Sequence, residues 1–74
     1  MVFEKVQEII AEKLGMEEAE ISMDSSLEED LEVDSLDIVD IVTALEDEFQ
    51  IEIPQDDLKD MEKVSDLVSY IESK

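Results

Sequence analysis

The sequence has no cysteine and no histidine among its 74 residues. Without cysteine the chain can form no disulfide and offers no thiolate nucleophile. Without histidine it has neither a Ser-His-Asp triad nor a typical zinc site. These absences exclude most of the side-chain arrangements by which enzymes act. We therefore expect a protein that is not an enzyme and that has no metal site.

Positive charge is also scarce, because five lysines are the only basic residues against 24 acidic ones, and the net charge is −19. Phosphate binding needs clustered lysine or arginine, and an anionic bilayer repels so acidic a surface. Neither nucleic acid nor a membrane is therefore an expected partner. Basic proteins should be attracted instead, with a strong dependence on salt.

Long apolar runs are missing as well. No run approaches the ~20 residues of a membrane span, and the first residues do not form a signal peptide, so we expect a cytoplasmic protein. A hydrophobic fraction of 43% nevertheless argues for a folded chain. Residues 1–74 are expected to form a single domain, because neither half could bury a core alone. We also expect the chain to be a monomer.

Three segments carry apolar residues at the spacing of an amphipathic helix. The first covers residues 2–14 and is followed by Gly15, the only glycine, which predicts a left-handed C-terminal cap. The second covers residues 35–49, with Asp34 as a suitable N-cap. The third runs from residue 64 to 71.

The segments between these helices lack a helical period. Residues 16–33 predict a long loop, in which Ser26 with Glu29 can cap a short turn. A short helix is predicted around residues 56–60. The apolar anchors of the loop are Ile21, Leu27 and Leu31. The predicted fold is all-α: a small four-helix bundle of three main helices and one short helix, with a long loop between the first two.

The second predicted helix has two apolar faces. Its core stripe is Ile38, Ile41, Val42, Leu45 and Phe49. Roughly opposite lie Leu36, Val39 and Thr43, flanked by Asp40, Glu46 and Asp47. One apolar face is enough to pack the helix, so the second face suggests a partner surface. The alternative is that the long loop partly covers Leu36 and Val39.

Ser35 begins this helix beside Asp34, and by position alone it is an ordinary first-turn residue. The surrounding segment, Leu-Glu-Val-Asp-Ser-Leu-Asp at residues 31–37, resembles the acyl carrier protein family. The family's Asp-Ser-Leu core is intact. An acidic helix follows through residues 44–49, and then Ile-Glu-Ile-Pro at residues 51–54. The resemblance runs along almost the whole chain.

The resemblance implies a carrier in which the Ser35 oxygen is joined to 4'-phosphopantetheine from coenzyme A. A phosphopantetheinyl transferase (holo-acyl carrier protein synthase) would attach the arm, whose thiol holds acyl groups as thioesters. The implied partners are basic-surfaced enzymes such as ketosynthases and acyltransferases. Fatty acid biosynthesis is the expected pathway, although a polyketide or other dedicated route would use similar residues.

The resemblance also assigns two groups of residues in this chain. The docking positions are Asp34, Leu36, Asp37, Val39, Asp40, Thr43, Glu46 and Asp47. The space for an acyl chain would lie near Leu45, Ile53, Leu58, Met61 and Tyr70. Two departures from the family are Glu32, where many members have glycine, and Thr43, where methionine is frequent. A glycine position predicts a positive φ at Glu32.

Two other readings compete with the carrier. Asp30, Glu32 and Asp34 alternate as calcium ligands do in an EF-hand. However, the sixth residue of that loop is Ser35 instead of glycine, and the twelfth is Ile41 instead of glutamate. The second reading is an acidic adaptor that binds basic proteins by charge alone. Loading by a transferase would separate the carrier from both.

Overall fold

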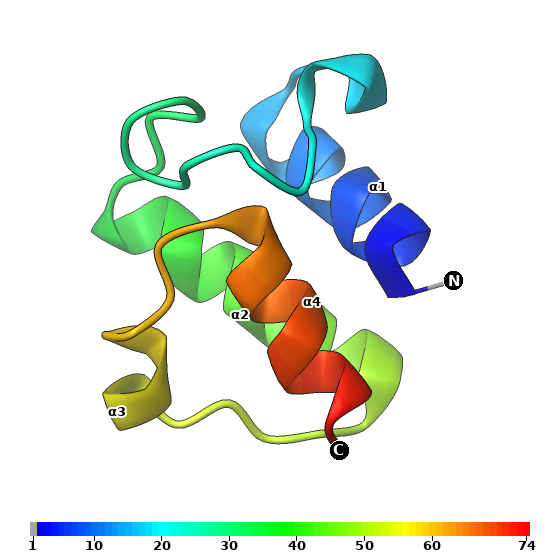
Figure 1. The fold of residues 1–74 in the computed structure, drawn as a ribbon, viewed down its shortest axis with the longest axis vertical. Helices are drawn as coiled ribbons and strands as arrows, with labels where there is room; N and C mark the ends of the chain where they lie inside the picture. The colour runs from blue at the N-terminus through cyan, green and yellow to red at the C-terminus, as the bar shows by residue number, and fades with distance from the viewer. Residues whose placement is uncertain (1) are drawn as a thin grey trace.

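The computed structural model describes residues 2–74, which form helices and loops without any strand (Figure 1). The helices are α1 (Val2–Leu14), the single 3-10 turn η1 (Glu18–Glu20), α2 (Ser35–Phe49), α3 (Gln55–Leu58) and α4 (Val64–Glu72). The all-α prediction is therefore confirmed, as are the bounds of the first two main helices. The last helix is one residue longer than predicted, and the short helix begins and ends earlier. η1 was not predicted.

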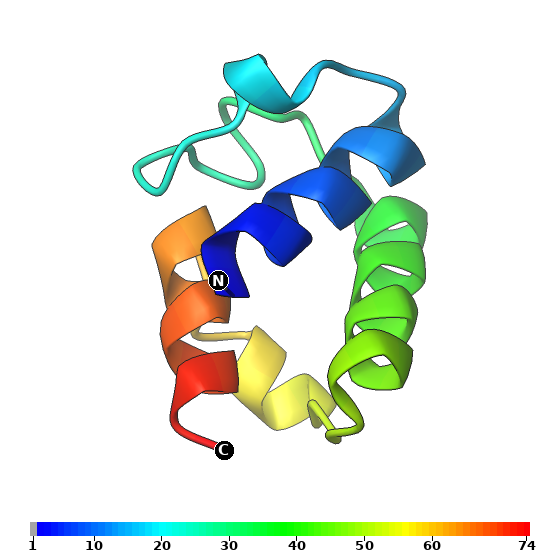
Figure 2. The same ribbon diagram turned by 90° about the vertical axis from the view of Figure 1, so that its right-hand side faces the viewer.

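Helix α1 lies between α2 and α4 and packs against both, while α2 and α4 run in the same direction (Figure 2). The connection through α3 returns the chain to the end of the molecule at which α2 began. The fully buried side chains come from all three main helices: Val6, Ile10, Ile41, Leu45, Val64 and Leu67. Burial of each contributes roughly 1.5–3 kcal/mol, so this shared core fixes the arrangement of the bundle.

The C-terminal ends of α1 and α2 are closed in the same way. Gly15 has a φ of 69° and the next residue, Met16, donates its backbone N–H to the Ala11 carbonyl at 3.0 Å. This is the predicted left-handed cap. At the end of α2, Gln50 takes a φ of 56° without being glycine, and Ile51 donates to the Glu46 carbonyl at 3.2 Å. The second cap has no glycine to signal it.

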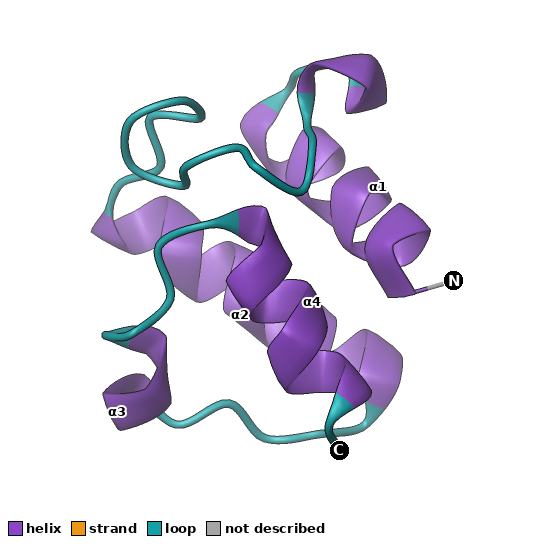
Figure 3. Ribbon diagram, viewed as in Figure 1, coloured by secondary structure: helices purple, strands orange, loops and turns teal. Residues whose placement is uncertain are grey.

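The long loop before α2 contains the turn η1 and is otherwise without helix (Figure 3). It is anchored at several points. Its predicted apolar anchors are all buried. The Gln7 amide donates to the carbonyls of Glu18 and Ile21 at 2.7 and 2.8 Å. The Leu27 N–H donates to the Glu62 carbonyl at 2.8 Å, which fastens the loop to the segment before α4. These bonds hold a loop of unusual length in one conformation.

One detail of the predicted cap inside this loop was wrong. The Ser26 hydroxyl accepts from the Glu29 backbone N–H at 3.2 Å, as expected. The carboxylate that reaches back to the Ser26 N–H belongs to Asp30, at 2.8 Å, and not to Glu29. The loop makes a single turn here, and in that turn the residue four positions on, not three, faces the serine.

Asp66 fixes the start of α4. Its Oδ2 accepts from the backbone N–H groups of Glu62 and Lys63 at 2.9 and 3.0 Å. These two bonds lower the pKa of Asp66 from its ordinary value of 3.8. Because the folded-state pKa is depressed, the resulting stability is present above the ordinary value and is lost as the pH falls through the lower one.

Glu32 has a φ of 54°, so the predicted positive angle is confirmed. We expect Glu32→Gly to raise the free energy of unfolding by up to about 1 kcal/mol. Glycine removes a left-handed penalty of ~1–2 kcal/mol, and the larger entropy of the unfolded chain offsets part of the gain. Urea unfolding measures the change. Glu32→Gln is the matched control, because it removes the same charge and keeps the Cβ; equal stability of the two variants would contradict the strain.

Candidate functional site

The first residues of α2 are held by a reciprocal pair of hydrogen bonds. The Asp37 backbone N–H donates to Asp34 Oδ1 at 2.9 Å, and the Asp34 backbone N–H donates to Asp37 Oδ2 at 3.4 Å. Asp34 is thus the N-cap, as predicted, and the pair forms a capping box. The box fixes where the loop ends and directs the next side chain, Ser35, away from the bundle.

Ser35 is exposed, and no hydrogen bond of residues 2–74 uses its hydroxyl. The backbone N–H groups of the first turn carry partial positive charge, which favours a phosphate at this end of the helix. The carboxylates of Asp34 and Asp37 stand on either side in the sequence and oppose that preference. A primary hydroxyl that is exposed and free of protein partners fits the attachment of a phosphate ester.

An open groove of about 600 Å³ lies beside Ser35, between the long loop, the start of α2 and the region of α3. Its apolar lining comes from all three: Leu27, Val33, Ile38, Val39, Leu58 and Met61. Its polar lining is Glu28, Asp34, Ser35, Gln55 and Lys59. An arm that begins at Ser35 therefore has an apolar surface directly next to its attachment point.

The residues predicted to surround an acyl chain do not all reach this groove. Leu58 and Met61 line it, whereas Leu45 and Ile53 are buried in the core and Tyr70 lies at α4. Sequence reasoning did not assign Leu27, Val33 or Ile38 to the site; it placed the first in the loop and the last in the core stripe. Only Val33 had a signal in the sequence, as an apolar residue among acids two positions before Ser35.

Tyr70 connects α4 with the short helix. Its hydroxyl donates to Asp57 Oδ2 at 2.8 Å and lies 3.3 Å from the Glu52 carbonyl. The hydrogen bond to the Asp57 carboxylate raises the pKa of Tyr70 above its ordinary value. Tyr70 therefore links α4 to α3 through this hydrogen bond.

The second apolar face of α2 is exposed. Leu36 is 77% and Val39 is 53% accessible, so the long loop does not cover Leu36 and covers at most part of Val39. Thr43 and the acids Asp40 and Asp47 are also exposed along this helix. The exposed strip and its acidic border thus follow α2 from Ser35 toward its C-terminal end.

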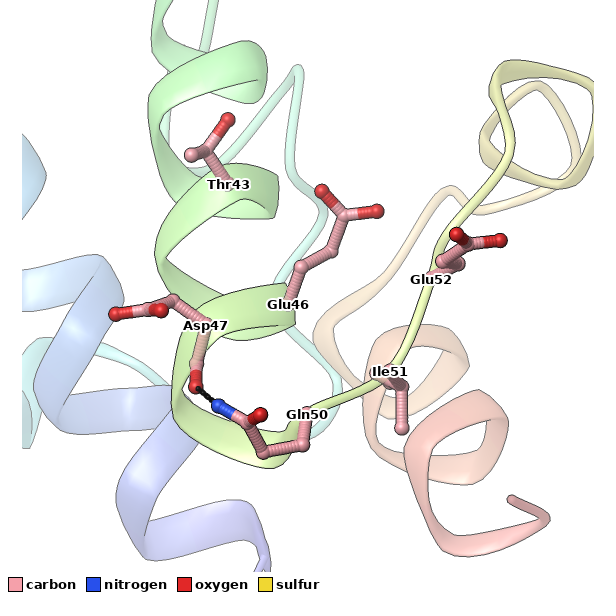
Figure 4. A pocket seen from close by; sticks show the side chains of 6 residues that line it. All are labelled: Thr43, Glu46, Asp47, Gln50, Ile51 and Glu52. Carbon is pink, nitrogen blue, oxygen red and sulfur yellow. Dashed lines mark hydrogen bonds between the residues drawn. The ribbon is translucent and has the colours of Figure 1, made fainter.

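A second, shallower hollow of about 460 Å³ lies at that C-terminal end, where Thr43, Glu46 and Asp47 project from α2 (Figure 4). Glu46 is half-buried, and its Oε2 accepts from the Ile53 backbone N–H at 2.7 Å. Three of the predicted docking acids, Asp34, Asp37 and Glu46, therefore also hold the backbone. Asp40 and Asp47 are exposed, and their side chains make no hydrogen bond within residues 2–74.

In the described part of the chain, no three or more Asp and Glu side chains converge on a point where they could hold a metal ion. The same residues include no helix of the length and apolarity needed to cross a membrane. The acidic side chains are instead spread over the surface. Only two ion pairs are formed among residues 2–74, Lys5 with Glu8 and Lys59 with Asp56.

Residues 4–71 match the family model described as a phosphopantetheine attachment site. An acyl carrier protein of Clostridium acetobutylicum is 51% identical over 73 residues, which cover 99% of this chain and 95% of the relative. An acyl carrier protein of Clostridium perfringens is 49% identical over 70 residues, covering 95% and 92%. The chain belongs to the acyl carrier protein family.

Membership confirms the resemblance seen in the sequence and the cofactor that it implied. The chain is an acyl carrier protein with a phosphopantetheine attachment domain, and its group is 4'-phosphopantetheine. The exposed hydroxyl of Ser35, the helix end on which it sits and the apolar groove beside it fit this group. Members of the family are carriers. The calcium-binding and adaptor readings are not favoured.

Glu46→Ala is expected to lower the free energy of unfolding by about 1–3 kcal/mol, because it leaves the part-buried Ile53 N–H without its charged acceptor. Glu48→Ala is the matched control: the same residue type is removed from the same helix, at an exposed position. Chemical denaturation of both variants checks the expectation. Equal stability would mean that the carboxylate contributes nothing to the segment before α3.

Proposed function

We propose that Ser35 is the residue to which 4'-phosphopantetheine is attached. Three observations support it: the hydroxyl is exposed at the first residue of α2, it has no hydrogen-bond partner among residues 2–74, and it lines the apolar groove. The last observation carries the proposal, since none of the chain's other serines lines that groove. Residues 1–74 then act as one acyl carrier domain.

In this proposal the chain presents a hydroxyl and does no catalysis. The Ser35 oxygen would form the new bond to the phosphorus that carries the pantetheine of coenzyme A, while the pyrophosphate P–O bond breaks and adenosine 3',5'-bisphosphate leaves. The hydroxyl proton would pass to a base of the transferase, which would also supply the metal. When bound, the arm supplies a terminal thiol on which acyl groups are held as thioesters. Asp34 and Asp37 serve to position the hydroxyl, because their carboxylates are engaged with the backbone.

The exposed strip on α2 is the proposed docking surface for these enzymes. Leu36 and Val39 supply apolar contact at its centre, with Thr43 further along. Asp34, Asp37, Asp40, Glu46 and Asp47 supply the negative border. Ketosynthases, acyltransferases and the transferase would approach with basic patches, since rim charges steer encounters and a desolvated apolar centre holds the complex.

An acyl chain would enter beside Leu58 and Met61, which pack against the core that contains Leu45 and Ile53. Tyr70 contributes by holding α3 at the edge of this region.

Fatty acid biosynthesis in the cytoplasm, by a monomeric carrier, is the setting we propose. The two clostridial relatives support the carrier role, because both are named acyl carrier proteins and this chain covers nearly all of each.

Ser35→Ala should abolish loading and leave the bundle folded. The hydroxyl oxygen is the attachment atom, whereas alanine is the better helix former at this position. Intact mass after incubation with coenzyme A, magnesium and a phosphopantetheinyl transferase should show one added arm on wild type and none on the variant. Circular dichroism should be unchanged.

Ser69→Ala is the control for this experiment, because Ser69 is exposed on α4 and does not line the groove. It should load like wild type. Loading of Ser35→Ala, or failure of wild type with several broad-range transferases, would refute the assignment. An unfolded Ser35→Ala protein would instead make Ser35 a structural residue and would contradict the expectation that its hydroxyl is free.

Reversal of Asp40 and Asp47 to lysine should slow association with the transferase about tenfold at low salt, because these exposed charges steer the encounter. They are chosen because neither side chain holds the fold. Leu36→Ala should mainly speed dissociation, by removing an apolar anchor. Stopped-flow kinetics separates the two effects.

The matched control reverses Glu4 and Glu12, two exposed acids of α1, and has the same net charge as the α2 variant. If docking uses the α2 surface, this control should associate faster than the Asp40 and Asp47 variant. Equal rates for the two would show that total charge matters and the position of the charge does not. That result would overturn the docking proposal.

A further inference from the structure

The groove beside Ser35 contains one positively charged residue. Its lining includes Glu28 and Asp34 as acids, and Lys59 is the one lysine of the chain's five that belongs to it. Lys59 comes from the C-terminal end of α3, on the opposite side of the groove from the start of α2. In a chain with a net charge of −19, this places a cation in the same groove as Ser35 and the acids Glu28 and Asp34.

The present partner of Lys59 binds it weakly. Lys59 Nζ lies 3.7 Å from Asp56 Oδ1, and the two side chains are 77% and 93% exposed. Pairs of this kind contribute little to stability, because water screens them and two long side chains must be ordered. The ammonium group can therefore exchange Asp56 for another anion within its reach at small cost.

Attachment of the arm changes the charge of this region. A phosphodiester at Ser35 adds a negative charge next to Asp34 and Asp37 in a molecule that already repels itself. The first-turn N–H groups offset part of this repulsion. Dissolved ions screen part of the rest, and among the groove residues Lys59 is the one cation that can offset more of it.

We propose that Lys59 is the electrostatic partner of the phosphate that joins the arm to Ser35, acting across the groove from α3 to α2. The inference rests on the proposed attachment at Ser35. It gives Lys59 a positioning role: the pair draws α3 toward the start of α2 once the arm is attached. In the protein without the arm, Lys59 pairs with Asp56 instead.

The test compares the thermal midpoint of each protein before and after attachment, with the arm confirmed by intact mass. At low salt, attachment should lower the thermal midpoint of Lys59→Gln by about 2–4 °C more than it lowers that of wild type. Without the arm the variant lacks the Asp56 pair, and with the arm it lacks the phosphate pair, so the difference measures how much more the phosphate pair stabilises the protein than the Asp56 pair does. The ³¹P chemical shift of the arm should also change in Lys59→Gln.

Two further variants complete the design. Lys5→Gln breaks the equivalent pair with Glu8 on α1, outside the groove, and should leave the effect of attachment as in wild type. Lys59→Arg keeps the charge and should restore wild-type behaviour. The Lys59 effect should shrink at high salt, where the Debye length is shorter.

The outcomes separate this inference from the proposed function. If the arm attaches to Ser35 but Lys59→Gln responds like wild type, the role of Lys59 is overturned and the attachment site stands. The same holds if Lys59→Arg behaves like Lys59→Gln, because charge would then not be the cause. If no arm attaches to Ser35 in wild type, both proposals are overturned.

Discussion

The position of Ser35 depends on the two hydrogen bonds that Asp34 and Asp37 exchange. These bonds determine the residue at which the loop ends and α2 begins. Because one residue corresponds to about 100° around a helix, the buried Ile41 and Leu45 set the direction in which Leu36 and the exposed strip face. The two carboxylates fix the end at which the hydroxyl stands, and the core fixes the direction of the strip.

The same carboxylates show that the acidic residues of this chain do not all have the same role. Asp34, Asp37, Glu46 and Asp66 each accept a hydrogen bond from the backbone, so their charge stabilises a helix end or a loop. Asp40 and Asp47 have no such bond within residues 2–74, so these are the acids that we propose for docking alone. Acids that hold the backbone and acids that we propose for docking are thus interleaved along α2.

The main helices could be predicted because their apolar spacing and their terminal residues agree. Asp34 at one end of α2 and Gly15 after α1 are local signals, and the structure places both as caps. The positive φ at Glu32 followed from the family, not from the residue itself. At Gln50 neither kind of signal exists, because the left-handed angle belongs to the turn by which the chain leaves α2 and not to the type of residue.

The groove could not be predicted from the sequence in the same way, because it joins residues from segments far apart in the chain. Leu27 and Met61 meet Ile38 only after the loop has been anchored by Gln7 and by the segment before α4. The resemblance directed attention to Leu58 and Met61, which do line the groove. It also directed attention to Tyr70, whose place is set by a hydrogen bond to Asp57 that no spacing rule indicates.

Helix α3 forms one wall of that groove, where Leu58 packs against the core and hydrogen bonds hold the segments on either side. Four residues are too few to form a stable helix alone, so its position depends on outside contacts. These are the Glu46 bond to Ile53 at its beginning and the Tyr70 bond to Asp57 within it. Segments with few buried apolar contacts open at lower free energy than the core does. Because α3 depends on these few contacts, we expect it to open at lower free energy than the main helices, and Lys59, which follows it directly, would move with it.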